Sequence, residues 1–180
     1  MFEDSRSKRV IILAHCLLNQ NSISDGTADF PSQFVELIEF LMKNKIGMIQ
    51  LPCPELHCLG LDRGDCNGTN RSILDENTRI RALITEDDHI VQLHEKAEEI
   101  AHQIQEYDRY GFQILGVIGV NRSPSCGVET TSKLGKEESG KGVFMKIILE
   151  TLTKYGIKIP MIGIKTSEPE TAMEQIKQFV

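Results

Sequence analysis

Four short apolar runs divide the chain, and each is rich in β-branched residues. They occupy residues 8–14, 46–51, 113–120 and 157–164. Runs of this length and composition are typical of strands that are buried on both faces of a sheet. Pro160, within the last run, has no N–H to donate to a neighbouring strand, which predicts an edge position or a bulge there.

Helical periodicity fills the stretches between these runs. Apolar residues recur at three- and four-residue steps over residues 31–44, 88–110, 143–155 and 168–180. Gly111 and Gly156 stand just past two of these stretches, where helices commonly end. Strands that alternate with helices predict parallel β-α-β units. The expected fold class is therefore α/β, a three-layer sandwich with a mostly parallel, Rossmann-like sheet.

Two stretches lack either pattern. Residues 53–78 are rich in Gly, Asp and Asn, with a short helix predicted near residues 72–81, and residues 121–141 are rich in Ser, Gly and Thr. Each is longer than the ~12–15 residues beyond which loops in compact domains tend to be functional. The glycine-rich residues 134–142 lack the spacing of a phosphate-binding loop and are predicted to form a flexible lid.

Composition limits the class of protein. A chain of 180 residues fits one domain, spanning residues 1–180, and 40% hydrophobic with 26% charged residues excludes a disordered chain. No apolar run approaches the ~18 residues of a membrane span, so no membrane association is expected. The N-terminus lacks the features of a signal peptide, which predicts a cytoplasmic location. A net charge of −6 without a basic run argues against general nucleic-acid binding, so a small-molecule substrate is expected, and the oligomeric state stays open.

Three of the five cysteines follow predicted strands at the same edge of the sheet. Cys16 lies two residues beyond the first strand, Cys53 two beyond the second and Cys126 six beyond the third. Because the carboxyl ends of parallel strands line one crevice, these thiols are expected to converge. Three thiolates suit a soft metal centre, either zinc or an iron–sulfur cluster with three protein ligands and one open iron.

The other two cysteines fit this arrangement less well. Cys58 lies near Cys53 and beside His57, but no second pair of ligands stands at the spacing of a zinc site. Cys58 and Cys66 are therefore left out of the expected ligand set, with Cys58 as a reserve ligand. Whether either of them ever binds metal stays open.

Short motifs around the three cysteines carry a resemblance to a known family. The motifs are Cys16-Leu17-Leu18, Cys53-Pro54-Glu55 and Ser123-Pro124-Ser125-Cys126-Gly127. In this order they resemble the thiouracil desulfidase family, formerly a domain of unknown function, over the chain as far as Gly127. The resemblance implies that Cys16, Cys53 and Cys126 bind a [4Fe-4S] cluster whose open iron takes the sulfur of the substrate. It also implies non-redox desulfuration of a thiouracil-like heterocycle, with release of sulfide.

The chain departs from the family pattern in two places. Asn19 stands where the family usually has Gly, and residues 57–63 stand where it has a Gly-Gly and a Pro-Arg. The cluster-binding positions are intact while the expected pocket wall differs. The substrate therefore stays open, including the choice between a free base and a thionucleoside carried by tRNA.

Glu55, Ser123 and Ser125 are the expected catalytic residues. Hydrolytic removal of sulfur needs a Lewis acid for the departing sulfur, a base for water and a proton source. Glu55, two residues from Cys53, is expected to act as the acid and base. One of the two serine hydroxyls is expected to donate to the substrate, and the choice between them stays open.

Two other functions fit the same residues. One is a non-catalytic iron–sulfur or zinc-binding protein or sulfur carrier, in which Glu55 would have no chemical role. The other is a cysteine-nucleophile hydrolase that pairs Cys126 with His15 or His57, which leaves the remaining cysteines without a role. By alternation along an extended chain, the side chain of His15 is expected to point away from that of Cys16.

Overall fold

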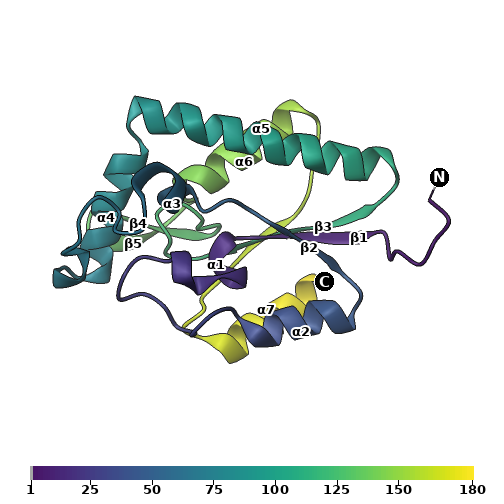
Figure 1. The fold of residues 1–180 in the computed structure, drawn as a ribbon, viewed down its shortest axis with the longest axis horizontal. Helices are drawn as coiled ribbons and strands as arrows, with labels where there is room; N and C mark the ends of the chain where they lie inside the picture. Colours follow the sequence, from purple (N-terminus) through teal and green to yellow (C-terminus); the bar gives the residue numbers. More distant parts are fainter. Residues whose placement is uncertain (1) are drawn as a thin grey trace.

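A computed structural model, which describes residues 2–180, has a four-stranded sheet between two layers of helices (Figure 1). The strands are β1 (Arg9–Leu13), β2 (Gly47–Gln50), β3 (Gln113–Val120) and β6 (Met161–Ile164). Their order is β2-β1-β3-β6, and every neighbouring pair is parallel. The expected α/β class, a three-layer sandwich with a parallel, Rossmann-like sheet, is confirmed.

Helices cover both faces of this sheet (Figure 1). One face is covered by α5 (Asp87–Arg109) and α6 (Val143–Lys154), and the other by α2 (Val35–Lys43) and α7 (Pro169–Phe179). Alternate residues of β1 face opposite layers. Ile12 therefore belongs to the core under α5 and α6, and Ile11 belongs to the core above α2 and α7.

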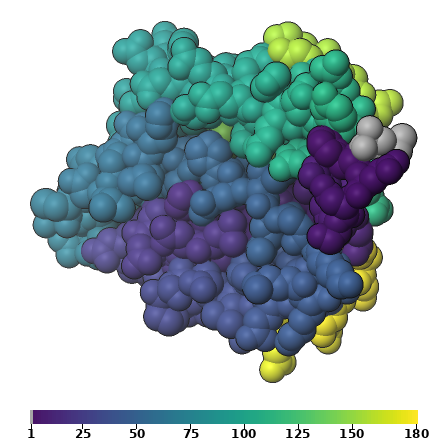
Figure 2. All heavy atoms as spheres, turned by 45° about the vertical axis from the view of Figure 1, so that its right-hand side comes forward, coloured from purple at the N-terminus to yellow at the C-terminus, as the bar shows by residue number. Residues whose placement is uncertain are grey.

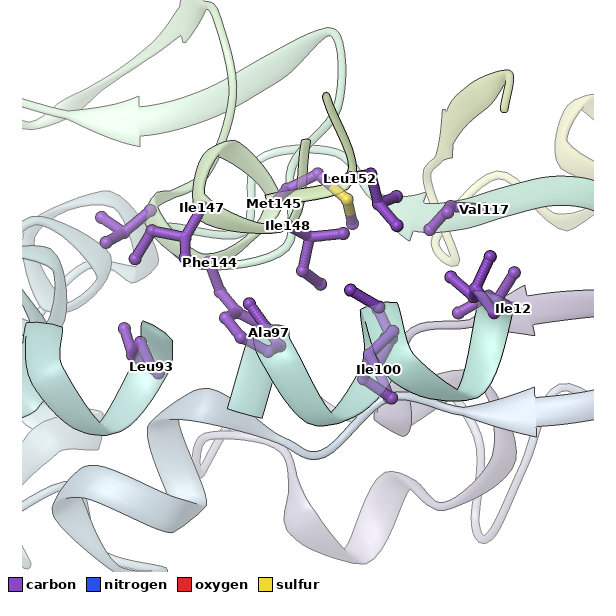
Figure 3. Packing of buried hydrophobic residues seen from close by; sticks show 14 of the residues in the cluster. Ile12, Leu93, Ala97, Ile100, Val117, Phe144, Met145, Ile147, Ile148 and Leu152 are labelled. Carbon is purple, nitrogen blue, oxygen red and sulfur yellow. The ribbon is translucent and has the colours of Figure 1, made fainter. Parts of the chain in front are cut away.

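The core between the sheet and α5 is built from interlocking aliphatic side chains (Figure 3). Figure 3 shows Ile12 and Val117 of the sheet near Ile100 of α5, with Leu152 of α6 beside Val117. Ile12 and Val117 have no exposed surface. The helical periodicity of residues 88–110 and 143–155 thus corresponds to the stripes that these two helices bury.

The prediction for Pro160 is confirmed. β6 is an edge strand, and Pro160 comes immediately before it. The carbonyl of Pro160 accepts a hydrogen bond from the N–H of Val117 at 3.0 Å, so proline joins the sheet through its acceptor alone.

The two stretches predicted to be irregular hold regular structure. The first contains α3 (Pro54–Leu59), a single 3-10 turn (Gly68–Asn70) and α4 (Ile73–Ile84), which is longer than the short helix expected there. The second contains a hairpin of β4 (Thr130–Lys133) and β5 (Lys136–Ser139).

The hairpin stands where a flexible lid was expected. Residues 134–142 supply its turn and its second strand, so the expectation of irregular structure over this stretch is wrong. The tip is bonded to α4, because the N–H of Gly135 donates to Oγ1 of Thr78 at 2.9 Å. Asn77 of α4 also donates to Oγ of Ser132 at 3.1 Å.

The chain turns as soon as β1 ends. A one-turn helix, α1 (His15–Leu18), and a 3-10 turn (Gln20–Ser22) follow the strand. The expectation that His15 lies on an extended chain is therefore wrong. Together with α3, α4 and the hairpin, α1 gathers at the carboxyl ends of the strands, on the left in Figure 1.

The N-terminal arm packs at the other end of the sheet. The ring of Phe2 lies 5.5 Å from that of Tyr110 and 6.1 Å from that of Phe112. Figure 2 shows this arm in dark purple against the surface of α5. Within residues 2–180, every helix is too short or too polar to span a lipid bilayer.

Candidate functional site

A cavity of about 220 Å³ opens at the carboxyl ends of the strands. After β1 the chain passes to β2 on one side and then to β3 on the other, and ligands of such sheets bind where the order reverses. Cys16 after β1, Cys53 after β2 and Cys126 after β3 all line this cavity. The structure therefore brings together the three cysteines that the strand ends were expected to bring together.

Cys53 is fixed by the start of α3. It occupies the N-cap position, where its Sγ accepts the N–H of Leu56 at 3.4 Å. Pro54 follows at the first helical position, where a residue without an N–H costs the helix nothing. Cys53 and Glu55 therefore enter the cavity from the first turn of one short helix.

The loop that carries Cys126 is held by its backbone. The Cys126 carbonyl accepts from the N–H of Val120 at 3.0 Å, and the Ser125 carbonyl accepts from Met145 at the start of α6, also at 3.0 Å. Gly142 lies so close to this loop that an added Cβ would stand 2.4 Å from the Ser125 carbonyl oxygen. Only glycine fits at that position without moving the loop.

The three thiols in the cavity are protonated in the metal-free protein. Burial, together with the neighbouring Cys53 sulfur, raises the pKa of Cys16 to about 12. Burial also raises the pKa of Cys53, with the Glu55 carboxylate adding to it, and raises that of Cys126 well above its ordinary value. A cationic centre that binds all three sulfurs would remove this penalty on their ionised forms.

Glu55 is buried and bound by three side chains. Its Oε1 accepts from Oγ of Ser125 at 2.6 Å, and its Oε2 accepts from Oγ of Ser24 and Nε of Arg63, each at 3.3 Å. Glu55 is 6% exposed and Arg63 is 2% exposed, so the pair forms a buried ion pair. The carboxylate is satisfied at both oxygens and held in one orientation.

The two predicted serines have different surroundings. Ser123 Oγ accepts from the N–H of Cys126 at 3.0 Å and from the N–H of Ser125 at 3.3 Å, which stabilises the turn. Ser125 Oγ donates to Oε1 of Glu55, lies 3.6 Å from Sγ of Cys126 and lies 3.2 Å from Oγ of Ser123. Both serines line the cavity, but only Ser125 bonds to the predicted acid and base.

Arg63 and Ser24 were missed by the sequence analysis. Both line the cavity, and both bond to Glu55. Arg63 lies in a stretch of mixed charge that is typical of a solvated loop, and no periodicity marks it as buried. One sequence feature could have indicated Arg63 as a site residue: it lies within residues 57–63, where the chain departs from the family pattern.

The two histidines of the hydrolase hypothesis lie apart. His15 lines the cavity beside Cys16, and its pKa is lowered because burial disfavours the charged ring. His57 is exposed on α3 and does not line the cavity. A thiol–imidazole pair at this site would therefore have to use His15.

Cys58 and Cys66 lie outside the cavity. Cys58 packs against the core under α5, and burial raises its pKa to about 11. Cys66 is exposed and lines a separate hollow with Asp62, Asp65 and Glu76. Neither thiol faces the other three cysteines across the cavity.

The donor chemistry of the cavity suits a soft metal centre. Across residues 2–180, no three His, Cys, Asp or Glu side chains are grouped closely enough to hold one metal ion. Cys16, Cys53 and Cys126 nevertheless share one cavity, and three cysteine sulfurs are donors typical of iron–sulfur centres.

Comparisons with known proteins give two similarities. No family model matches the chain. The chain is 28% identical over 165 residues to an uncharacterized protein of Methanocaldococcus jannaschii, a match that covers 92% of this chain and 91% of that protein. Among solved structures it is similar to a [4Fe-4S]-dependent thiouracil desulfidase, TudS, with a TM-score of 0.45 and 16% identity, over 94% of this chain and 99% of that one. Both similarities extend over nearly the whole of each chain.

Proposed function

We propose that residues 1–180 form a single-domain, [4Fe-4S]-dependent desulfidase that removes sulfur hydrolytically from a thiolated heterocycle. The observation that carries the proposal is one cavity lined by three cysteines from separate strand ends and by the bonded pair of Glu55 and Ser125. The two hydrophobic cores pack on opposite faces of one sheet, which supports a single domain.

Cys16, Cys53 and Cys126 would hold the cluster. Their motifs resemble those of the thiouracil desulfidase family, and three ligands leave one iron without a protein donor. When bound, the cluster would supply a Lewis-acidic iron that polarises a C=S bond and stabilises the departing sulfur. Binding of the cluster would displace the protons that burial keeps on these thiols in the metal-free protein.

Glu55 would carry the proton. The reaction converts C=S and H₂O into C=O and H₂S, so no electron is gained or lost. Glu55 takes a proton from the attacking water, whose oxygen forms the new bond to carbon, and returns it to the sulfur as the C–S bond breaks, while the second proton of that oxygen passes to the sulfur as the C=O bond forms. Its burial keeps bulk water from competing for that proton.

Ser125 is the serine that this chemistry would use. Its hydroxyl donates to Oε1 of Glu55, so it can pass a proton between the carboxylate and a bound substrate. The hydroxyl of Ser123 already accepts two backbone N–H groups of its own turn. We therefore assign Ser123 to the conformation of the loop and Ser125 to the reaction.

A small substrate fits this site best. The cavity, at about 220 Å³, would have to hold the cluster as well as the substrate, and it is already below the ~300–1,000 Å³ of pockets that take drug-sized ligands. A single thiolated ring, such as a thiouracil, is of that scale. The motif resemblance points to the same class of substrate.

Anaerobic reconstitution with iron and sulfide tests the proposal. We expect about four irons per chain with broad visible absorbance, and release of sulfide from 2-thiouracil or 4-thiouracil with the matching oxo base as product. Cys126→Ala should lose both the absorbance and the activity. Cys66→Ala is the matched control and should keep both, because Cys66 is exposed and outside the cavity.

Two results would favour the other functions. A stable cluster without sulfide release, unaffected by Glu55→Gln, would indicate a non-catalytic carrier. A colourless protein with one zinc per chain, or with no bound metal, would overturn the desulfidase mechanism.

A further inference from the structure

Arg63 uses all of its hydrogen-bond donors inside the protein. A guanidinium has five N–H groups, and Arg63 has five acceptors. They are Oε2 of Glu55 at 3.3 Å, the carbonyls of Gly60 at 2.6 Å and Leu61 at 3.3 Å, the carbonyl of Ser22, and Sγ of Cys53 at 3.9 Å. The side chain therefore joins the turn after α1, the end of α3 and the cavity.

We propose that Arg63 is a positioning residue that holds the Glu55 carboxylate in the orientation its chemistry needs. This inference rests on the proposed function, because it gives Arg63 a role in the same reaction. The guanidinium binds Oε2 of Glu55 and Sγ of Cys53, so it fixes the distance between the base and one metal-binding sulfur. Arg63 itself would not touch the substrate's reacting atoms.

The division of contacts between the two carboxylate oxygens supports this role. Arg63 and Ser24 both bind Oε2, which leaves Oε1 to accept from Ser125. Rotation of the carboxylate would break the bonds to Arg63 and Ser24, so the arrangement has one preferred state. A displacement of about 1 Å in a reacting group can cost ~100-fold in rate.

A role in stability alone explains the buried ion pair of Arg63 and Glu55 less well. A buried ion pair is expensive to desolvate, and well-packed apolar residues of similar volume often stabilise a protein as much. Arg63 also adopts a left-handed conformation with φ of 54°, which is uncommon for a residue with a side chain. Its carbonyl is held there by Nη2 of Arg79 at 3.0 Å.

Arg63→Met is the variant that isolates the donors. Arg63 and Ser24 line both the cavity and the neighbouring acidic hollow, so a small residue would join the two spaces. Methionine fills most of that volume and donates no hydrogen bond. Arg71→Met is the matched control, because Arg71 bonds to Asp65 and Glu76 of the same region and does not line the cavity.

We expect kcat of the reconstituted Arg63→Met protein to fall about 100-fold, with KM changed by less than about threefold and iron content unchanged. Arg63→Lys should keep more kcat, because an ammonium can still donate to Oε2 of Glu55. In a Glu55→Gln background, Arg63→Met should have little further effect, since both changes act through the same carboxylate. Full kcat in Arg63→Met, or losses that add to those of Glu55→Gln, would overturn the proposal.

A crystal structure of the metal-free Arg63→Met protein gives a test that does not depend on activity. We expect the 2.6 Å contact between Glu55 Oε1 and Ser125 Oγ to be lost. If the contact stays, the proposal is wrong. If the unaltered chain releases no sulfide, the proposed function fails, but this structure still decides whether Arg63 orients Glu55. If Arg63→Met does not fold, Arg63→Lys decides: we expect its kcat to fall in proportion to the displacement of the Glu55 carboxylate in its structure, and a displaced carboxylate with full kcat would overturn the proposal.

Discussion

The hydroxyl of Ser125 donates to Oε1 of Glu55 over 2.6 Å, although 70 positions separate the two residues in the chain. Glu55 belongs to the helix that follows β2, and Ser125 to the loop that follows β3. These strands lie on either side of β1, so the parallel sheet delivers both side chains to the same end. A short contact between a buried hydroxyl and a buried carboxylate is a strong hydrogen bond, so the two residues should act as a unit.

Ser125→Ala removes one half of this unit. We expect sulfide release by the reconstituted protein to fall about 100-fold, at the low end of the ~10²–10⁴ that a positioned proton-transfer group contributes. The iron content should stay the same, because the backbone hydrogen bonds of Cys126 do not involve the Ser125 hydroxyl. Rates of sulfide release and iron analysis of the same preparation would check both statements.

Ser123→Ala is the matched control and should affect stability more than chemistry. The hydroxyl of Ser123 accepts the N–H groups of Ser125 and Cys126, so its loss should lower the free energy of unfolding by about 1–3 kcal/mol. Urea denaturation of the metal-free protein measures this change. If Ser123→Ala abolished sulfide release without a change in stability, the roles of the two serines would be reversed.

The cavity thiols should resist alkylation in the metal-free protein. Burial raises the pKa of Cys16 to about 12, whereas Cys66 is exposed. Only the thiolate reacts, and at pH 8 a thiol with that pKa is ionised in about one molecule in ten thousand. We expect iodoacetamide to modify Cys66 first, as mapped by peptide mass spectrometry, and the labelling of Cys16 to accelerate as the pH rises. Equal rates at the two thiols would contradict the raised pKa of Cys16.

Gly142→Ala should disturb the loop that carries Cys126. An added Cβ would stand 2.4 Å from the Ser125 carbonyl oxygen and 2.7 Å from the Cys126 nitrogen, so the loop must move. We expect a loss of about 1–3 kcal/mol in the free energy of unfolding and a reduced iron content after reconstitution. Gly47→Ala is the control, because its Cβ would meet no atom closer than 3.4 Å. The same small effect from both substitutions would show that the loop tolerates displacement.

The parts of the fold that the sequence predicted depend on local patterns. The four strands of the main sheet and the helices α2, α5, α6 and α7 bury continuous runs or periodic stripes, as Ile11 and Ile12 of β1 do on opposite faces. The convergence of Cys16, Cys53 and Cys126 follows from strand direction, because parallel strands end at one edge. Sequence spacing is enough for both inferences.

The parts that it missed depend on tertiary contacts. The hairpin of β4 and β5 is built from Thr, Ser, Lys and Glu, so no apolar alternation marks its strands. Arg63 is buried only because its acceptors come from the turn after α1, from α3 and from the following loop. A single sequence suggests a solvated arginine there, since arginine is rarely buried without such partners.

The loop that places Arg63 should lose stability in acid. Glu76 accepts from Nη2 of Arg79 at 2.5 Å, and this hydrogen bond is the main cause that lowers the pKa of Glu76 below its ordinary value. Because the folded pKa is lower than the unfolded one, the stabilisation is complete above the unfolded value, about 4.3. It is lost as the pH falls through the folded value.

Glu76→Gln should therefore lower the free energy of unfolding by about 1–3 kcal/mol at pH 7, and this difference should shrink below pH 4 as Glu76 itself becomes neutral. Glu99→Gln is the control, because Glu99 pairs with Lys96 on the exposed side of α5 and should contribute little. Urea denaturation at several pH values measures both. A difference for Glu76→Gln that stays constant from pH 7 to pH 3 would show that the ion pair is not what stabilises the loop. A shrinking difference would link the backbone of Arg63, which Arg79 also binds, to the charge of Glu76.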